Sequence, residues 1–194
     1  MLGVVNRIVP LSLVDGPGAR AVVFLQGCSF RCGACHNPNT IGRCIVCGRC
    51  VEACTSHALE RGGERAPPHF DANRCRACDT CIARCPELAD PRARRLSPST
   101  LVEELRPWAG YLRGITISGG EPTQQPAFVA ALLDALEADP QLAAWHRLID
   151  SNGHAPLELW RELAPRCDGV ALDVKAVDPA LHERLTGFDN GLVL

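Results

Sequence analysis

Lysine is almost absent from this chain, because Lys175 is the only lysine beside nineteen arginines. The formal net charge is −2 with both signs interspersed, which argues against the basic surface that nucleic acids or anionic membranes attract. No apolar run approaches the ~20 residues of a membrane-spanning helix, and the N-terminal "MLGVVNRIVP" lacks a small-residue cleavage site for export. We therefore expect a cytoplasmic protein in which the single lysine marks a candidate functional position.

Cysteine, in contrast, is abundant, and its distribution is uneven. All of the twelve cysteines except Cys167 lie between residues 28 and 85. Disulfides are rare in the cytosol because thiols are kept reduced there. The clustering therefore indicates metal ligands, whereas we expect Cys167 to be a packed free thiol.

The hydrophobic pattern alternates between strand and helix four times. Strands are expected at 19–27, 114–118, 147–150 and 169–173, and helices at 97–112, 126–138, 156–164 and 179–187. In these helices Thr100 with Glu103 fits a capping box, Pro126 suits a first turn, and Gly187 suits the end of the last helix. Such alternation predicts an α/β protein built of parallel βα units.

Ligands of parallel α/β sheets and barrels bind at the carboxyl ends of the strands. Here these ends are the loop after residue 27, "SGGEP" (118–122), "DSNG" (150–153) and "DVK" (173–175). All four segments are polar, charged or rich in glycine. We expect them to converge on one face of the sheet.

Residues 41–90 have a different composition, dominated by cysteine, arginine and glycine, and we expect them to form an inserted module. Two C-x2-C-x2-C-x3-C runs lie in it, and their spacing resembles bacterial two-cluster ferredoxins. That resemblance implies two [4Fe-4S] clusters whose fourth ligands cross over, one held by Cys44, Cys47, Cys50 and Cys85 and the other by Cys54, Cys75, Cys78 and Cys81. Pro86 matches the ferredoxin signature, whereas Thr55 replaces its other proline. Structural zinc is the alternative, but a tetrahedral site would leave four thiolates unused.

The stretch "QGCSFRCGACHNPNT" holds only three cysteines, Cys28, Cys32 and Cys35. His36 is a poor fourth ligand because it is adjacent to Cys35. A cluster held by three cysteines keeps one iron open to a substrate, as catalytic zinc sites keep one open position.

C-x3-C-x2-C after the first expected strand resembles the radical S-adenosylmethionine (SAM) superfamily, and "ISGGEP" resembles its GGE motif. The resemblance implies that SAM binds the open iron of a [4Fe-4S] cluster and is cleaved to a 5′-deoxyadenosyl radical. Gly119 and Gly120 would allow close backbone approach, and Glu121 would accept hydrogen bonds from the SAM amine. Ala34 replaces the usual adenine-stacking aromatic, so the adenine would rest on the backbone of Cys35 and His36 or on a group outside this loop.

The segments "VDGPGARAVVFLQGC", "CHNP", "DSNG" and "LDVK" together resemble the activating enzymes of glycyl radical enzymes, such as pyruvate formate-lyase activase. "TIGRCIVCGRC" most resembles the YjjW-type members of the subgroup with a ferredoxin insert. The family implies SAM contacts from Asp173, Val174 and Lys175. It also implies a monovalent-cation site (Na⁺ or K⁺) at Asp150 and Asp173, and a contact between Asp15 and the substrate peptide.

The resemblance implies a partial (β/α) barrel formed by residues 1–40 and 91–194, interrupted by a ferredoxin-like module at 41–90. Family members have two further βα units, so we expect this chain to be a C-terminally truncated piece with four of six units. An unpaired fourth strand would then be left at the edge of the sheet.

The leading functional hypothesis is an oxidoreductase that uses SAM to generate a glycyl radical on a partner enzyme. Its other partner would be an electron donor such as flavodoxin or ferredoxin, and three [4Fe-4S] clusters are expected. A radical SAM enzyme acting on a small molecule and a non-catalytic iron–sulfur electron carrier remain as alternatives. His57, His69, His146, His154 and His182 show no ligand spacing.

Overall fold

A computed structural model describes all 194 residues of the protein. A six-stranded sheet has the order β5-β1-β2-β6-β7-β8. The four strands predicted from the sequence are mutually parallel, whereas β1 runs antiparallel to both β2 and β5. The strands are β1 (Gly3–Ser12), β2 (Arg20–Leu25), β5 (Arg94–Leu96), β6 (Gly114–Gly119), β7 (His146–Ser151) and β8 (Gly169–Leu172).

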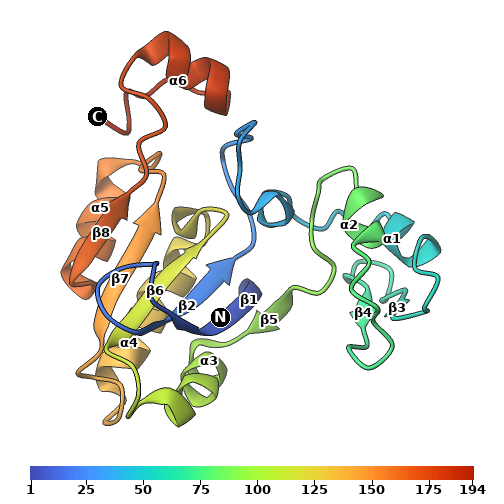
Figure 1. The fold of residues 1–194 in the computed structure, drawn as a ribbon, viewed down its shortest axis with the longest axis horizontal. Helices are drawn as coiled ribbons and strands as arrows, with labels where there is room; N and C mark the ends of the chain where they lie inside the picture. The colour runs from blue at the N-terminus through green and yellow to red at the C-terminus, as the bar shows by residue number, and fades with distance from the viewer.

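One face of this sheet is covered by helices (Figure 1). Alternate strand residues such as Val23 and Ile117 point into a buried core shared with Leu101 and Leu133 of the helices, as period-2 strand geometry requires. These helices are α3 (Pro98–Leu105), α4 (Pro126–Ala138) and α5 (Leu157–Leu163), whereas α6 (Pro179–Thr186) lies beyond the carboxyl ends of the strands (Figure 1). The opposite face carries the other set of residues, which includes Phe24 and Ser118, and it is therefore free to form a site.

The sequence did not predict β1 or β5, and two helix details were wrong. Ser97, not Thr100, caps α3, because the Ser97 side chain accepts a hydrogen bond from the backbone N–H of Thr100. The expected helix at 97–112 ends as α-helix at Leu105 and continues as the 3-10 helix η2 (Arg106–Trp108), which contains a proline. The predicted first-turn Pro126 and the left-handed Gly187 are confirmed.

Residues 41–90 lie beside the β5 edge of the sheet and hold only short elements (Figure 1). These are α1 (Arg49–Glu52), α2 (Thr80–Ala83) and a two-stranded sheet of β3 (Leu59–Glu60) and β4 (His69–Phe70). The remaining 3-10 turns are η1 (Pro38–Thr40), η3 (Pro122–Gln124) and η4 (Ala164–Arg166). No helix of the protein combines the length and the apolar character that crossing a bilayer would need.

Candidate functional site

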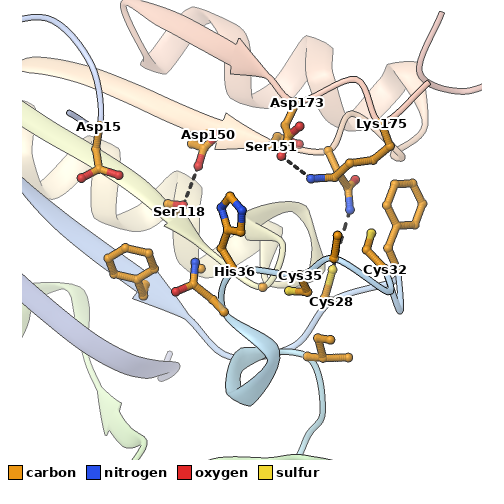
Figure 2. Close-up of a pocket in the computed structure, with 18 of the residues that line it drawn as sticks. Asp15, Cys28, Cys32, Cys35, His36, Ser118, Asp150, Ser151, Asp173 and Lys175 are labelled. Carbon is orange, nitrogen blue, oxygen red and sulfur yellow. Dashed lines mark hydrogen bonds and ion pairs between the residues drawn. The ribbon is translucent and has the colours of Figure 1, made fainter. Parts of the chain in front are cut away.

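A cavity of about 650 Å³ opens at the carboxyl ends of β2, β6, β7 and β8, on the face without helices. Its volume lies within the range of small-molecule sites. Figure 2 shows the cysteines at one end and Asp15 at the other. The structure brings these predicted residues together along its wall: Asp15, Cys28, Cys32, Ala34, Cys35, His36, Gly119, Gly120, Asp150, Asp173 and Lys175.

The three cysteines lie on the loop that follows β2. Cys28 is packed most deeply, and burial, with added repulsion from Glu121 and the other two thiols, raises its pKa to about 11. Burial also raises the pKa of Cys32, although the nearby Lys175 ammonium opposes this effect. The three sulfurs face one cavity and form a donor set suited to a metal cluster with one open position. Metal binding requires the thiolate form, which the nearby Lys175 ammonium favours at Cys32.

Packing against residues 154–188 supports the shape of this loop. Phe30 is 1% exposed and lies against the rings of His154, His182 and Phe188, with centroid distances of 5.2, 5.5 and 5.7 Å. The backbone N–H of Arg31 donates to the carbonyl of Thr186 at 3.2 Å. The segment around α6 therefore supports the cysteine loop from behind, and two histidines without ligand spacing take part in this packing.

The glycine pair after β6 allows a close approach between two pieces of backbone. A Cβ on Gly120 would lie 2.4 Å from the carbonyl oxygen of Gly27, and one on Gly119 would lie 2.1 Å from the backbone nitrogen of Leu25. Gly119 also has φ +126°, which disfavours other residues. The pair thus seats the GGE turn directly against the start of the cysteine loop.

Glu121 has a different place from the one that the sequence suggested. It is 1% exposed, does not line the cavity, and accepts hydrogen bonds from Thr123, from the Ser151 hydroxyl at 2.8 Å and from the Asn152 N–H at 2.8 Å. Asn152 in turn donates from Nδ2 to the sulfur of Cys28 at 3.8 Å. The Glu121 carboxylate is therefore linked to Cys28 indirectly, by the two hydrogen bonds that Asn152 donates. Burial raises the pKa of Glu121 despite these donors.

Five charged side chains lie along the cavity wall, namely Arg7, Asp15, Asp150, Asp173 and Lys175. Asp173 and Lys175 form an ion pair, and Ser118 donates to Asp150 at 2.6 Å. Burial, followed by repulsion from Asp173 and Asp15, raises the pKa of Asp150 despite the Ser118 hydrogen bond. Burial alone would lower the pKa of Lys175, but Asp173 and the neighbouring thiols raise it, so the amine carries its charge at neutral pH.

Several wall residues were not predicted from the sequence, and a second predicted residue besides Glu121 is missing from the wall. Val174 does not line the cavity. The additional wall residues are Arg7, Val9, Phe24, Phe30, Asn37, Ile41, Ser118, Ser151 and Asn152. Three of these stand in the strand-end segments "SGGEP" and "DSNG", where a polar residue after a strand was an available signal. The residues of β1 had none, because that strand was not predicted.

The eight cysteines of residues 41–90 separate into two groups in space. One narrow pocket is lined by Cys44, Cys47, Cys50 and Cys85, and a second by Cys54, Cys75, Cys78 and Cys81. Each group takes three sulfurs from one cysteine run and one from the other, which is the crossed pattern of the sequence analysis. No three His, Cys, Asp or Glu side chains anywhere in the protein are placed to hold a single metal ion.

Comparison with known proteins gives a family model and several relatives. The Radical SAM superfamily model matches residues 22–191. The isethionate sulfite-lyase activating enzyme of Desulfovibrio desulfuricans is 34% identical over 99% of this chain and 66% of the relative. The (2S)-3-sulfopropanediol dehydratase activating enzyme of Klebsiella oxytoca is 29% identical over 99% of this chain and 65% of the relative.

A third relative, the 4-hydroxyphenylacetate decarboxylase activating enzyme of Clostridium scatologenes, is 29% identical over 99% of this chain and 66% of its own length. The chain therefore spans about two thirds of the length of the relatives it matches.

Proposed function

The chain belongs to the radical SAM superfamily, and we propose that it activates a partner glycyl radical enzyme by SAM-dependent hydrogen abstraction. The relatives named above are all activating enzymes. One observation carries the proposal: the Cys28 loop after β2 and the Asp173–Lys175 pair after β8 line the same cavity. A bound [4Fe-4S] cluster and SAM would supply the 5′-deoxyadenosyl radical.

The side chains of the cavity have separate tasks in this proposal. Cys28, Cys32 and Cys35 would hold the cluster, and the Lys175 ammonium would attract the carboxylate of SAM. The adenine would rest on the backbone beside Ala34, Cys35 and His36, and Val174 could contribute only from outside the cavity wall. Glu121 would act as a positioning residue for Asn152 rather than as a direct SAM contact.

The far end of the cavity would receive the partner. A monovalent cation between Asp150 and Asp173 would offset the repulsion that raises the pKa of Asp150. Asp15, whose side chain accepts a hydrogen bond from Ser12, would contact the glycine-bearing segment. A cavity with the cluster at one end and Asp15 at the other would place the reacting glycine between them.

We further propose that the parallel strands are part of a (β/α) barrel, with residues 41–90 inserted as a two-cluster ferredoxin-like module. The two pockets with four cysteines each support this assignment. An electron-donor protein would supply electrons to this module. Iron analysis tests it, because about twelve irons per chain are expected for three cubane clusters, whereas stoichiometric zinc would contradict it.

The decisive experiment incubates the reduced, iron-loaded protein with SAM and a candidate glycyl radical enzyme. A glycyl signal in electron paramagnetic resonance is expected. If 5′-deoxyadenosine forms without that signal for any candidate enzyme, a small-molecule substrate becomes the better hypothesis.

A further inference from the structure

A groove lies between the two short helices of the module, away from the main cavity. Its volume is about 650 Å³, and α1 and α2 form its two sides (Figure 1). The charged residues in its wall are Arg49 and Glu52 from α1 and Arg84 at the end of α2. The role proposed above leaves this groove without a function.

The free charge of the groove is positive. Arg49 and Arg84 are exposed, and neither takes part in any ion pair of the protein. Glu52 is already paired, because Arg61 contacts its carboxylate at 2.6 Å. Two unpaired guanidinium groups on the rim therefore present a surface that attracts an acidic partner.

Both arginines also lie next to the same cysteine group. Arg49 directly precedes Cys50, and Arg84 directly precedes Cys85, and these two cysteines line one pocket together. Thr80, from the groove wall, donates to the sulfur of Cys78 of the other pocket at 3.4 Å. A protein seated on the groove would thus approach both cysteine groups, and short separation favours electron transfer.

We propose that a small acidic one-electron carrier protein docks on the groove between α1 and α2, with Arg49 and Arg84 contacting its carboxylates. This inference rests on the proposed two-cluster module. The carrier loses one electron and the module gains one, and no bond or proton transfer is needed. Redox encounters of this kind use small interfaces and depend on electrostatic steering, which suits a modest charged groove.

The test measures how fast an acidic, reduced flavodoxin reduces the iron-loaded full chain in stopped-flow absorbance. Arg49→Glu and Arg84→Glu are each expected to slow this second-order reaction by about tenfold at low salt, with a smaller loss at high salt. Arg65→Glu is the matched control, because Arg65 is also exposed, in the same module, and outside the groove. It should stay within about twofold of the unaltered chain.

Two further measurements separate docking from damage to the module. Iron content should equal that of the unaltered chain, and photoreduced deazaflavin, a small reductant, should reduce all variants at one rate. Arg49→Lys and Arg84→Lys should restore most of the flavodoxin rate because they restore the charge. Equal rates for the groove variants and Arg65→Glu, with about twelve irons bound, would overturn the docking site alone. About four irons per chain would overturn the two-cluster module and this inference together.

Discussion

The main cavity and the two cysteine pockets of the module present cysteine in two different settings. The cavity receives three cysteines from one loop, and its wall also contains charged residues from distant segments, such as Asp15 and Lys175. Each module pocket receives four cysteines, and the one around Cys50 has otherwise apolar or glycine walls. The comparison teaches that the group of three cysteines lies beside a large space of about 650 Å³, whereas each group of four cysteines lines a narrow pocket of about 20 Å³.

The sharpest way to break this comparison is to remove one cysteine from each region. Cys32→Ala should abolish SAM cleavage and lower the iron content by about four per chain, because two sulfurs would remain for that cluster. Cys47→Ala should lose about four irons as well but keep SAM cleavage with a chemical reductant. Iron analysis and 5′-deoxyadenosine formation measure both effects. Equal loss of cleavage in the two variants would show that the regions are not functionally distinct.

The next largest effect is expected at the single lysine. Lys175→Ala should weaken SAM binding by about ten- to a hundredfold, since hydrogen bonds to charged groups contribute roughly 1.5–3 kcal/mol. Lys175→Arg keeps the charge and should lose less, although its planar head cannot reproduce every contact of an ammonium. Calorimetric titration with SAM measures the affinities. Unchanged affinity in Lys175→Ala would remove this residue from the site.

The module pockets and the main cavity also differ in how well the sequence predicted them. The two cysteine runs are visible in the sequence by their spacing, and the resemblance to two-cluster ferredoxins implied the crossed grouping of the cysteines. The four parallel strands and the loop after residue 27 were also visible, since buried strands are apolar and end at polar turns. The overall partial barrel stays a prediction.

What the sequence left out depends on contacts between distant segments. Glu121 was expected to accept hydrogen bonds from the SAM amine. Its carboxylate instead accepts from Ser151 and Asn152, which only the fold brings next to it. Phe30 gave no signal, because the rings that cover it come from residues 154–188. The edge strand β5 is three residues long, too short for a periodic pattern.

Glu121 allows a further test of the difference between the main cavity and the module, because its contacts with Ser151 and Asn152 join distant segments beside the main cavity. Glu121→Gln turns an acceptor into a donor, and either orientation of the amide leaves a donor such as the Asn152 N–H without a partner. The free energy of unfolding should fall by about 1–3 kcal/mol. Urea unfolding measures it, with Ser151→Ala as a milder control that removes one hydrogen bond. The spectra of the module clusters should not change. Loss of these spectra in Glu121→Gln would contradict the independence of the module from the main cavity.

The smallest effect is expected at the junction of the two regions. Asp90 accepts hydrogen bonds from Asn39 at 3.1 Å and from Arg92 at 2.8 Å, and Arg92 also contacts Asp79 of the module. Burial alone would raise the pKa of Asp90, but these donors outweigh burial and hold the pKa below its ordinary value.

A lowered folded-state pKa means that Asp90 stabilises the protein fully above the unfolded pKa of about 3.9, and that this stabilisation disappears as the pH falls through the folded value. Asp90→Asn should therefore lower the free energy of unfolding by about 1 kcal/mol, and by the same amount at pH 8 as at pH 5.5. Urea unfolding at the two pH values measures the difference. A loss that changes strongly between them would mean that another titrating group, and not the Asp90–Arg92 contact, holds the module to the sheet.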